Sequence, residues 1–148
     1  MSLLEKEVAL HTPFILSLAD MLPHLKIHHA QARSLSENTW LVEVGIENSG
    51  YLPTYTSQQA KKRGAARPVF AELDLSDPAR LVTGKKRVEI GHLEGRSNKD
   101  MLSSSHGTSP TDNRARVSWL VEAPGGTTLQ ITIRSERAGV LRKTIILS

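Results

Sequence analysis

Six histidines are the residues of this sequence whose chemistry points first to a metal ion. A zinc site needs three or four ligands that converge on one point, and imidazole nitrogens and carboxylate oxygens are its donors in a chain without cysteine. His28 and His29 are adjacent in a predicted strand, so we expect their rings to point to opposite faces. His92 precedes Leu93 and Glu94, one residue short of the spacing His-x-x-Glu. These spacings predict no metal site and no cofactor in this chain.

The other patterns that support catalysis are incomplete. No serine lies in a Gly-x-Ser-x-Gly turn, and Gly84-Lys85-Lys86 lacks both the leading glycine and the trailing hydroxyl residue of a phosphate loop. Acidic pairs such as Glu72 and Asp74 fall on the polar face of a predicted strand. With no cysteine, disulfides and thiolate catalysis are excluded. We therefore predict no catalytic, cofactor-binding or metal-ligating residue, and expect that this chain is not an enzyme by itself.

Basic residues form two clusters in a chain whose net charge is +4, namely Lys61-Lys62-Arg63 and Lys85-Lys86-Arg87. Such clusters raise the possibility of nucleic-acid binding. Acidic residues are interspersed with them, at Glu72, Asp74, Glu89 and Glu94. A solvated face of mixed charge explains that pattern as well. We expect no nucleic-acid partner.

The N-terminal segment reads as a helix over residues 12–22. Thr12 fits the N-cap, Pro13 fits the first helical position, and Pro23 ends the run. The segment resembles neither a signal peptide nor a membrane span, because charged and polar residues interrupt it. Its apolar residues form a broad stripe that needs a cover, at Phe14, Ile15, Leu18, Met21 and Leu22. That cover could be the chain's own sheet, a preceding domain, or a second copy of the chain in a homodimer.

From Leu25 onward the apolar period changes to two, which indicates strands. The alternation recurs in about seven runs, at residues 25–33, 39–47, 69–75, 85–92, 117–121, 129–133 and 140–147. Short strands with regular turns predict an all-β, antiparallel sandwich of the immunoglobulin or fibronectin type III kind over residues 25–148, after a helical segment over residues 1–24. Trp40 and Trp119 fall on the apolar phase, so we expect both in the core.

Three connections carry clear turn or loop signals. Pro124-Gly125-Gly126 and Ala138-Gly139 each supply the glycine of a tight turn, which predicts two antiparallel hairpins in the last third of the chain. Residues 94–114 are nearly all small, polar or charged. We expect them to form a mobile loop that folding does not require.

The string of motifs resembles a known family. ENSGYLPTYTSQQAKK at 47–62, RPVFAEL at 67–73, VEIGHLEGRS at 88–97 and residues 114–145, which contain SERAG, are similar to the domain that follows the catalytic domain in bacterial zinc carboxypeptidases. HTPFILSLADMLPHL at 11–25 resembles the last helix of that peptidase domain. The resemblance implies a non-catalytic accessory domain, a peptidase domain upstream as its partner, and zinc in that upstream domain. None of the zinc ligands can be placed on this sequence.

Two other classes of function are also compatible with the sequence. A free-standing adhesion or carbohydrate-binding sandwich is the main alternative, although sugar binding needs exposed aromatic platforms and the sequence has few aromatics. A nucleic-acid binder is the third class. The domain upstream of Met1 distinguishes the first class from the other two.

Overall fold

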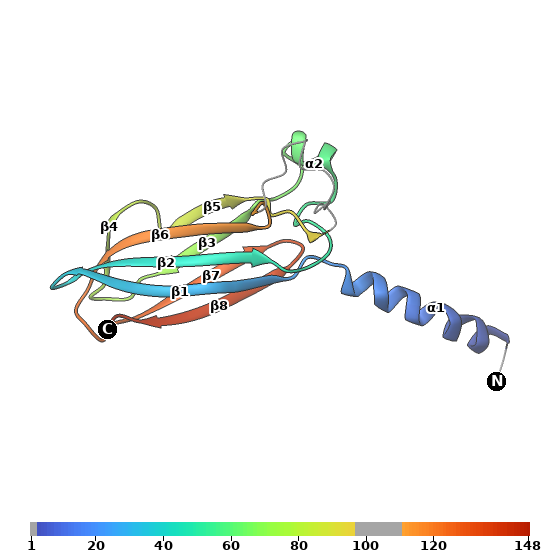
Figure 1. The fold of residues 1–148 in the computed structure, drawn as a ribbon, viewed down its shortest axis with the longest axis horizontal. Coiled ribbons are helices and arrows are strands. Elements are labelled where there is room, and N and C mark those ends of the chain that lie inside the picture. Colours follow the sequence, from blue (N-terminus) through green and yellow to red (C-terminus); the bar gives the residue numbers. More distant parts are fainter. Residues whose placement is uncertain (1–2, 97–110) are drawn as a thin grey trace.

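A computed structural model describes residues 3–96 and 111–148 of the chain. Two four-stranded antiparallel sheets pack face to face, and a helix extends from one end of the sandwich (Figure 1). The elements in chain order are α1 Leu3–Asp20, β1 Leu25–Ser36, β2 Thr39–Asn48, α2 Gln58–Lys62, β3 Val69–Asp74, β4 Arg80–Thr83, β5 Arg87–Gly91, β6 Arg114–Glu122, β7 Thr128–Ser135 and β8 Gly139–Ile146. The predicted all-β sandwich with an N-terminal helix is confirmed.

The strand order matches that of an immunoglobulin-like sandwich. One sheet has the order β1-β2-β6-β4 and the other β5-β3-β7-β8, which correspond to A-B-E-D and C′-C-F-G. Here the strand in the D position, β4, comes before the strand in the C′ position, β5. The structure has eight strands where the sequence predicted about seven. The strand that was missed, β4, has only four residues, too few for a convincing alternation.

The inward residues of β2, β6 and β7 form the centre of the core. Val42 lies opposite Trp119 in the register of β2 and β6, and Trp40 lies opposite Val121. Both tryptophans are buried, as predicted, and each indole N–H has a partner: Trp40 donates to the carbonyl of Ala123 at 2.9 Å, and Trp119 to a backbone carbonyl at 3.1 Å. The rings therefore fill the core without leaving a buried donor unsatisfied.

One of the two predicted hairpins is wrong. Pro124-Gly125-Gly126 connects β6 to β7, but these strands belong to different sheets, so the connection crosses the sandwich. Gly126 has a φ of 84°, which the turn requires, and its N–H donates to the carbonyl of Leu147. A glycine turn fits either kind of connection, so the local signal could not separate them. The second hairpin, between β7 and β8, is confirmed.

The helix begins earlier than the sequence predicted. α1 runs over Leu3–Asp20, and Pro13 lies inside it. Thr12 is not an N-cap, because its Oγ1 donates to the carbonyl of Val8, 2.8 Å away, within the helix. Residues 3–11 are rich in good helix formers, and their propensity outweighs the proline signal.

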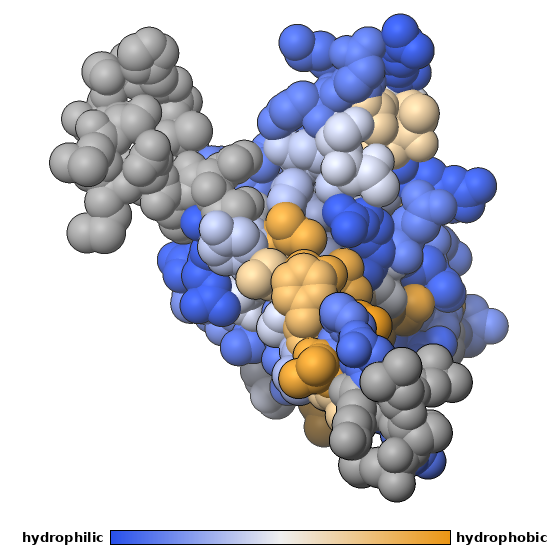
Figure 2. Space-filling view, turned by 90° about the vertical axis from the view of Figure 1, so that its right-hand side faces the viewer, coloured by the Kyte–Doolittle hydropathy of each residue, from blue (hydrophilic) through white to orange (hydrophobic). Residues whose placement is uncertain are grey.

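α1 does not pack against either sheet. It projects away from the sandwich (Figure 1), and its apolar side chains are exposed, with Phe14 at 63%, Ile15 at 62% and Leu18 at 46%. Figure 2 shows apolar side chains gathered on the side of the molecule from which α1 extends. The chain's own sheet is therefore not the cover of the stripe. A search for a helix apolar enough and long enough to cross a bilayer finds none among the described residues.

Candidate functional site

The fold brings three of the stretches that carry the resemblance, NSGYLPT, GHLEGR and SERAG, to one end of the sandwich at the root of α1, whereas RPVFAEL runs into β3. We call this region the motif end, and define it as residues 48–62, 92–96, 111–113 and 135–138. It contains the loop after β2, the loop after β5, the three residues just before β6 and the turn between β7 and β8. Hydrogen bonds and close backbone packing join these segments to one another.

Asn48 is the central residue of the motif end and is fully buried at the last position of β2. Its side-chain Oδ1 accepts from the backbone N–H of His24 at 2.9 Å and of Gly50 at 3.1 Å. Its Nδ2 donates to the carbonyls of Leu52 at 2.9 Å and Glu94 at 3.0 Å. One amide thus links the start of β1, the loop after β2 and the loop after β5.

Asn113 binds the backbone of Asn48. The N–H of Asn48 donates to the carbonyl of Asn113 at 2.9 Å, and Nδ2 of Asn113 donates back to the carbonyl of Asn48 at 3.2 Å. Asn113 is 3% exposed, and Gly95 is buried as well. The prediction of a mobile loop over residues 94–114 is therefore wrong at both of its ends, and its central part, 97–110, lies outside the described residues.

Two glycines of the motifs allow backbone segments to approach closely. A Cβ on Gly50 would lie 2.3 Å from the carbonyl oxygen of Leu22 and 2.8 Å from Cα of Pro23. A Cβ on Gly95 would lie 2.2 Å from the carbonyl oxygen of Tyr51. No side chain fits at either position without moving the backbone, so glycine is needed for contact rather than for a turn.

Backbone hydrogen bonds tie the end of α1 to the loop after β2. The N–H of Leu52 donates to the carbonyl of Met21 at 2.9 Å, and the N–H of Ser49 donates to the carbonyl of His24 at 2.8 Å. The hydroxyl of Ser49 also donates to that carbonyl, at 3.2 Å. These bonds hold the residues that connect α1 to β1 against the loop after β2.

The SERAG stretch at 135–139 holds the loop after β2 through Arg137. The guanidinium of Arg137, in the sequence SERAG, donates to the carbonyl of Tyr55 at 2.7 Å and more weakly to that of Pro53 at 3.4 Å. On the other side of this loop, Thr54 and Leu93 exchange hydrogen bonds: the Thr54 N–H donates to the Leu93 carbonyl, and the Leu93 N–H donates to Oγ1 of Thr54, both at 2.9 Å. The loop after β2 is thus held from two sides.

Tyr55 anchors this loop in the sandwich and is 3% exposed. Its hydroxyl donates to Glu94 at 2.6 Å and accepts from the amide of Gln58 in α2. The ammonium group of Lys61 lies 3.3 Å from the carboxylate of Glu94 and 4.8 Å from the centre of the Tyr55 ring. Lys61, from the first basic cluster, therefore has a structural role.

His92 packs its ring edge-on to Tyr55, with the ring centres 5.7 Å apart. Its Nδ1 is buried and has no hydrogen-bond partner among the residues that the structure describes. Burial lowers the pKa of His92 below its ordinary value, and the positive charge of Lys61 lowers it further, while Glu89 and Glu94 oppose the shift. Burial and Lys61 thus favour the neutral form of the His92 ring.

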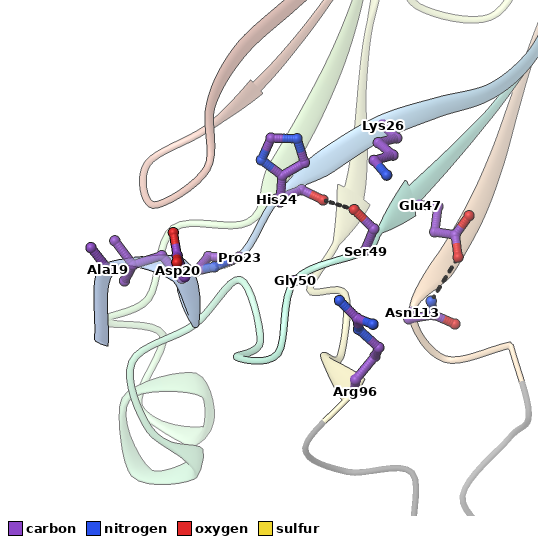
Figure 3. A pocket seen from close by; sticks show the side chains of 11 residues that line it. Ala19, Asp20, Pro23, His24, Lys26, Glu47, Ser49, Gly50, Arg96 and Asn113 are labelled. Atoms are coloured by element: carbon purple, nitrogen blue, oxygen red, sulfur yellow. Dashed lines mark hydrogen bonds between the residues drawn. The ribbon is translucent and has the colours of Figure 1, made fainter. Parts of the chain in front are cut away.

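A hollow of about 620 Å³ lies between the root of α1 and the sandwich. Figure 3 shows its lining side chains, which come from the end of α1, the start of β1 and the loops after β2 and β5. Charges of both signs line it, from Asp20, Lys26, Glu47 and Arg96. Such a lining suits a charged group of a partner better than an apolar ligand.

The prediction that His28 and His29 point to opposite faces is wrong. A register shift between Ile27 and His29 forms a bulge in β1, opposite Gly45 of β2. The ring of His29 lies directly over Gly45, His28 lies 3.8 Å from the outward carboxylate of Glu47, and the two ring centres are 6.0 Å apart. Both rings are therefore on the outer face. Even so, no group of three His, Asp or Glu residues suited to a metal ion occurs within residues 3–96 and 111–148.

The motif end fixes the positions of its loops relative to one another, because the side chains of Asn48, Thr54, Tyr55 and Arg137 bond between loops, although Nδ1 of His92 and Oδ1 of Asp112 have no partner among the described residues. Sequence reasoning identified its motifs but missed the role of Asn48 and Asn113, whose partners are distant in the chain. A search among curated proteins finds no match. The family described as Domain of unknown function (DUF8731) matches residues 24–146, from the first residue after Pro23 to the last residue of β8, and the chain belongs to that family.

Proposed function

We propose that this chain is the non-catalytic accessory domain of a zinc carboxypeptidase and that it holds the preceding peptidase domain in a fixed position. One observation carries the proposal. Three of the stretches on which the resemblance rests, NSGYLPT at 48–54, GHLEGR at 91–96 and SERAG at 135–139, lie largely in loops after separate strands, and the fold brings these three to the root of α1. The segment that resembles the end of a peptidase domain is attached at that root.

An accessory domain can hold a preceding domain in position only if the connection between the two is rigid. We call this connection, formed by residues 21–24 and the motif end, the joint. Asn48 bonds to His24 just before β1, Gly50 allows the loop to touch the turn at Leu22-Pro23, and Leu52 bonds to Met21, the first residue after α1. Arg137 and Tyr55 brace the same loop against the sandwich. A rigid β-sandwich that ends in such a joint suits a positioning role.

The two domains would have different roles. The zinc ion and its ligands belong to the preceding domain, where the ion would polarise the scissile carbonyl and activate a water. The present chain contributes stability and position. Adhesion through sugar binding has less support, because Trp40, Trp119 and Tyr55 are buried and Arg87 lies over the ring of Phe70, which leaves Tyr51 as the exposed aromatic ring of the sandwich.

The experiment begins with the coding sequence upstream of Met1. We expect it to encode a peptidase domain with His-x-x-Glu, and the complete gene product to release C-terminal residues from peptides in a zinc-dependent way. Gly50→Ala in that product should lower the activity and the melting temperature of the peptidase domain. The matched variant Gly125→Ala should leave both unchanged, because a Cβ there meets nothing closer than 3.9 Å. An upstream region without a peptidase domain would overturn the proposal.

A further inference from the structure

The exposed stripe of α1 has the spacing of a helix-pairing seam. Its residues recur at alternating intervals of three and four, at Val8, His11, Ile15, Leu18 and Leu22, and Phe14 and Met21 flank them. Met21 and Leu22 lie in the turn after α1, which ends at Asp20, and their N–H groups bond back to the carbonyls of Leu18 and Ala19. The apolar members are all exposed, between 39% and 62% for Ile15, Leu18, Met21 and Leu22. A seam with this spacing fits the side of another helix.

α1 needs such a cover in order to be a stable helix. It has 18 residues, contains Pro13, and has no buried side chain among those the structure describes. Proline removes one hydrogen bond from the helix interior, and most of the stability of helices in proteins comes from packing. An isolated α1 would therefore fray.

We propose that the α1 stripe pairs with the α1 stripe of a second copy of the chain, antiparallel, about a two-fold axis near Ile15. Charge selects this direction. In the antiparallel arrangement Val8 faces Leu22 of the other copy, and the acidic residues Glu5 and Glu7 come beside its His24 and Lys26. A parallel pair would instead place Glu5 and Glu7 of both copies at one end of the pair, away from these basic residues, and would lose the attraction.

The hollow at the root of α1 fits the same arrangement. It is lined by Leu22, the last residue of the seam, by Lys26 and Arg96, and also by Asp20 and Glu47. Within the described part of the chain Lys26 and Arg96 have no carboxylate within ion-pair distance, whereas Glu47 already pairs with His28 and Arg114. The N-terminal turn of the second helix would bring Glu5 and Glu7 toward this hollow. α1 projects clear of the sandwich (Figure 1), so a second helix can lie along it and the two sandwiches occupy opposite ends.

The inference does not rest on the proposed function, because it concerns the stripe and not the joint. In a longer protein, a preceding domain that covered the stripe would take the place of the second copy. A monomeric chain would overturn the pairing and leave the joint intact. An upstream region without a peptidase domain would overturn the proposed function and leave the pairing intact.

Sedimentation at micromolar concentration tests the pairing. We expect the parent chain to be a dimer and Leu18→Asp to be a monomer whose tryptophan fluorescence shows a folded sandwich. Val82→Asp, at a residue on β4 that is 48% exposed, is the matched control and should remain a dimer. A monomeric parent, or a dimeric Leu18→Asp, would overturn the proposal.

Disulfide formation tests the direction of the pair, because the chain has no native cysteine. Ile15→Cys should crosslink with itself, and Val8→Cys should crosslink with Leu22→Cys when the two variants are mixed. Val8→Cys alone should crosslink much more slowly. Crosslinking of Val8→Cys with itself at the rate of the mixture would show a parallel pair or random collisions, and would contradict the antiparallel arrangement.

Discussion

Asn48 and Asn113, 65 residues apart in the chain, each bind the other's backbone. The pair joins the end of β2 to the start of β6, and the Asn48 amide extends the connection to His24, directly after the turn that follows α1. Both residues are buried. The direction of α1 and the pairing of two inner strands of the sandwich therefore depend on one cluster of amides.

Asn48→Ala should strongly destabilise the chain. The substitution leaves the N–H groups of His24 and Gly50 and the carbonyls of Leu52 and Glu94 without their partner. Because buried polar groups without partners are costly, we expect the free energy of unfolding to fall by at least about 3 kcal/mol in urea titrations. Asn38→Ala, at an exposed turn residue, should change it by less than about 0.5 kcal/mol. Equal effects of the two variants would show that Asn48 is not central.

Gly50→Ala should strain the joint. The added methyl group would lie 2.3 Å from the carbonyl oxygen of Leu22, and the backbone must move to accept it. We expect a loss of about 1–3 kcal/mol in unfolding free energy, measured by thermal and urea denaturation. Gly125→Ala, with its nearest contact at 3.9 Å, should have almost no effect. A parent-like Gly50→Ala would mean that the contact between the loop and the root of α1 is loose.

The sheets could be predicted from the sequence because their signal is local. Alternation over β2, β6 and β7 located the inward residues, and both tryptophans lie where that alternation placed them. The assignment of strands to sheets was not accessible in the same way, because Pro124-Gly125-Gly126 fits both a hairpin and a crossing between sheets. Pairing depends on contacts between distant residues, which a turn signal does not contain.

Removing either core tryptophan should destabilise the sandwich by about 3–5 kcal/mol, since truncation leaves a cavity in addition to the lost burial. Trp40→Ala and Trp119→Ala each also leave a backbone carbonyl without its donor. Urea titrations would measure the loss. Val140→Ala, at a residue that is 45% exposed, should stay close to the parent. If both tryptophan variants unfold like the parent, the assignment of the core is wrong.

The motif end could be predicted from the sequence only in part. The sequence stretches around Asn48, His92 and Arg137 were identified by their resemblance to the domain that follows the catalytic domain in zinc carboxypeptidases. No local feature of the sequence shows that the three stretches lie together in the fold. Gly50 and Gly95 are required because of backbone segments elsewhere in the chain, which a local reading cannot see. The start of α1 was misplaced for the opposite reason, because a strong local signal at Thr12-Pro13 was outweighed by the helix formers before it.

His92 should make stability depend on pH. Its pKa is lower in the folded chain than in the unfolded one, so the unfolded chain binds the proton more readily and acid favours unfolding. Stability should therefore fall as the pH drops from about 7.5 to 5.5, through the ordinary range of histidine. Melting temperatures across this range should fall less in His92→Gln than in the parent. Lys61→Met should also reduce the fall, because it removes one cause of the lowered pKa. Identical pH profiles would show that His92 does not contribute.

The rigidity of the joint is tested most directly by the distance between spin labels on α1 and on the sandwich. Leu16→Cys, which is off the pairing stripe, and Arg33→Cys on β1 are exposed positions in a chain without other cysteines. Dilution with unlabelled chain restricts the signal to distances within one molecule. A rigid joint predicts one narrow distance distribution in the parent and a broad one in Gly50→Ala. A parent distribution as broad as that of Gly50→Ala would contradict a fixed direction for α1, and with it the positioning role.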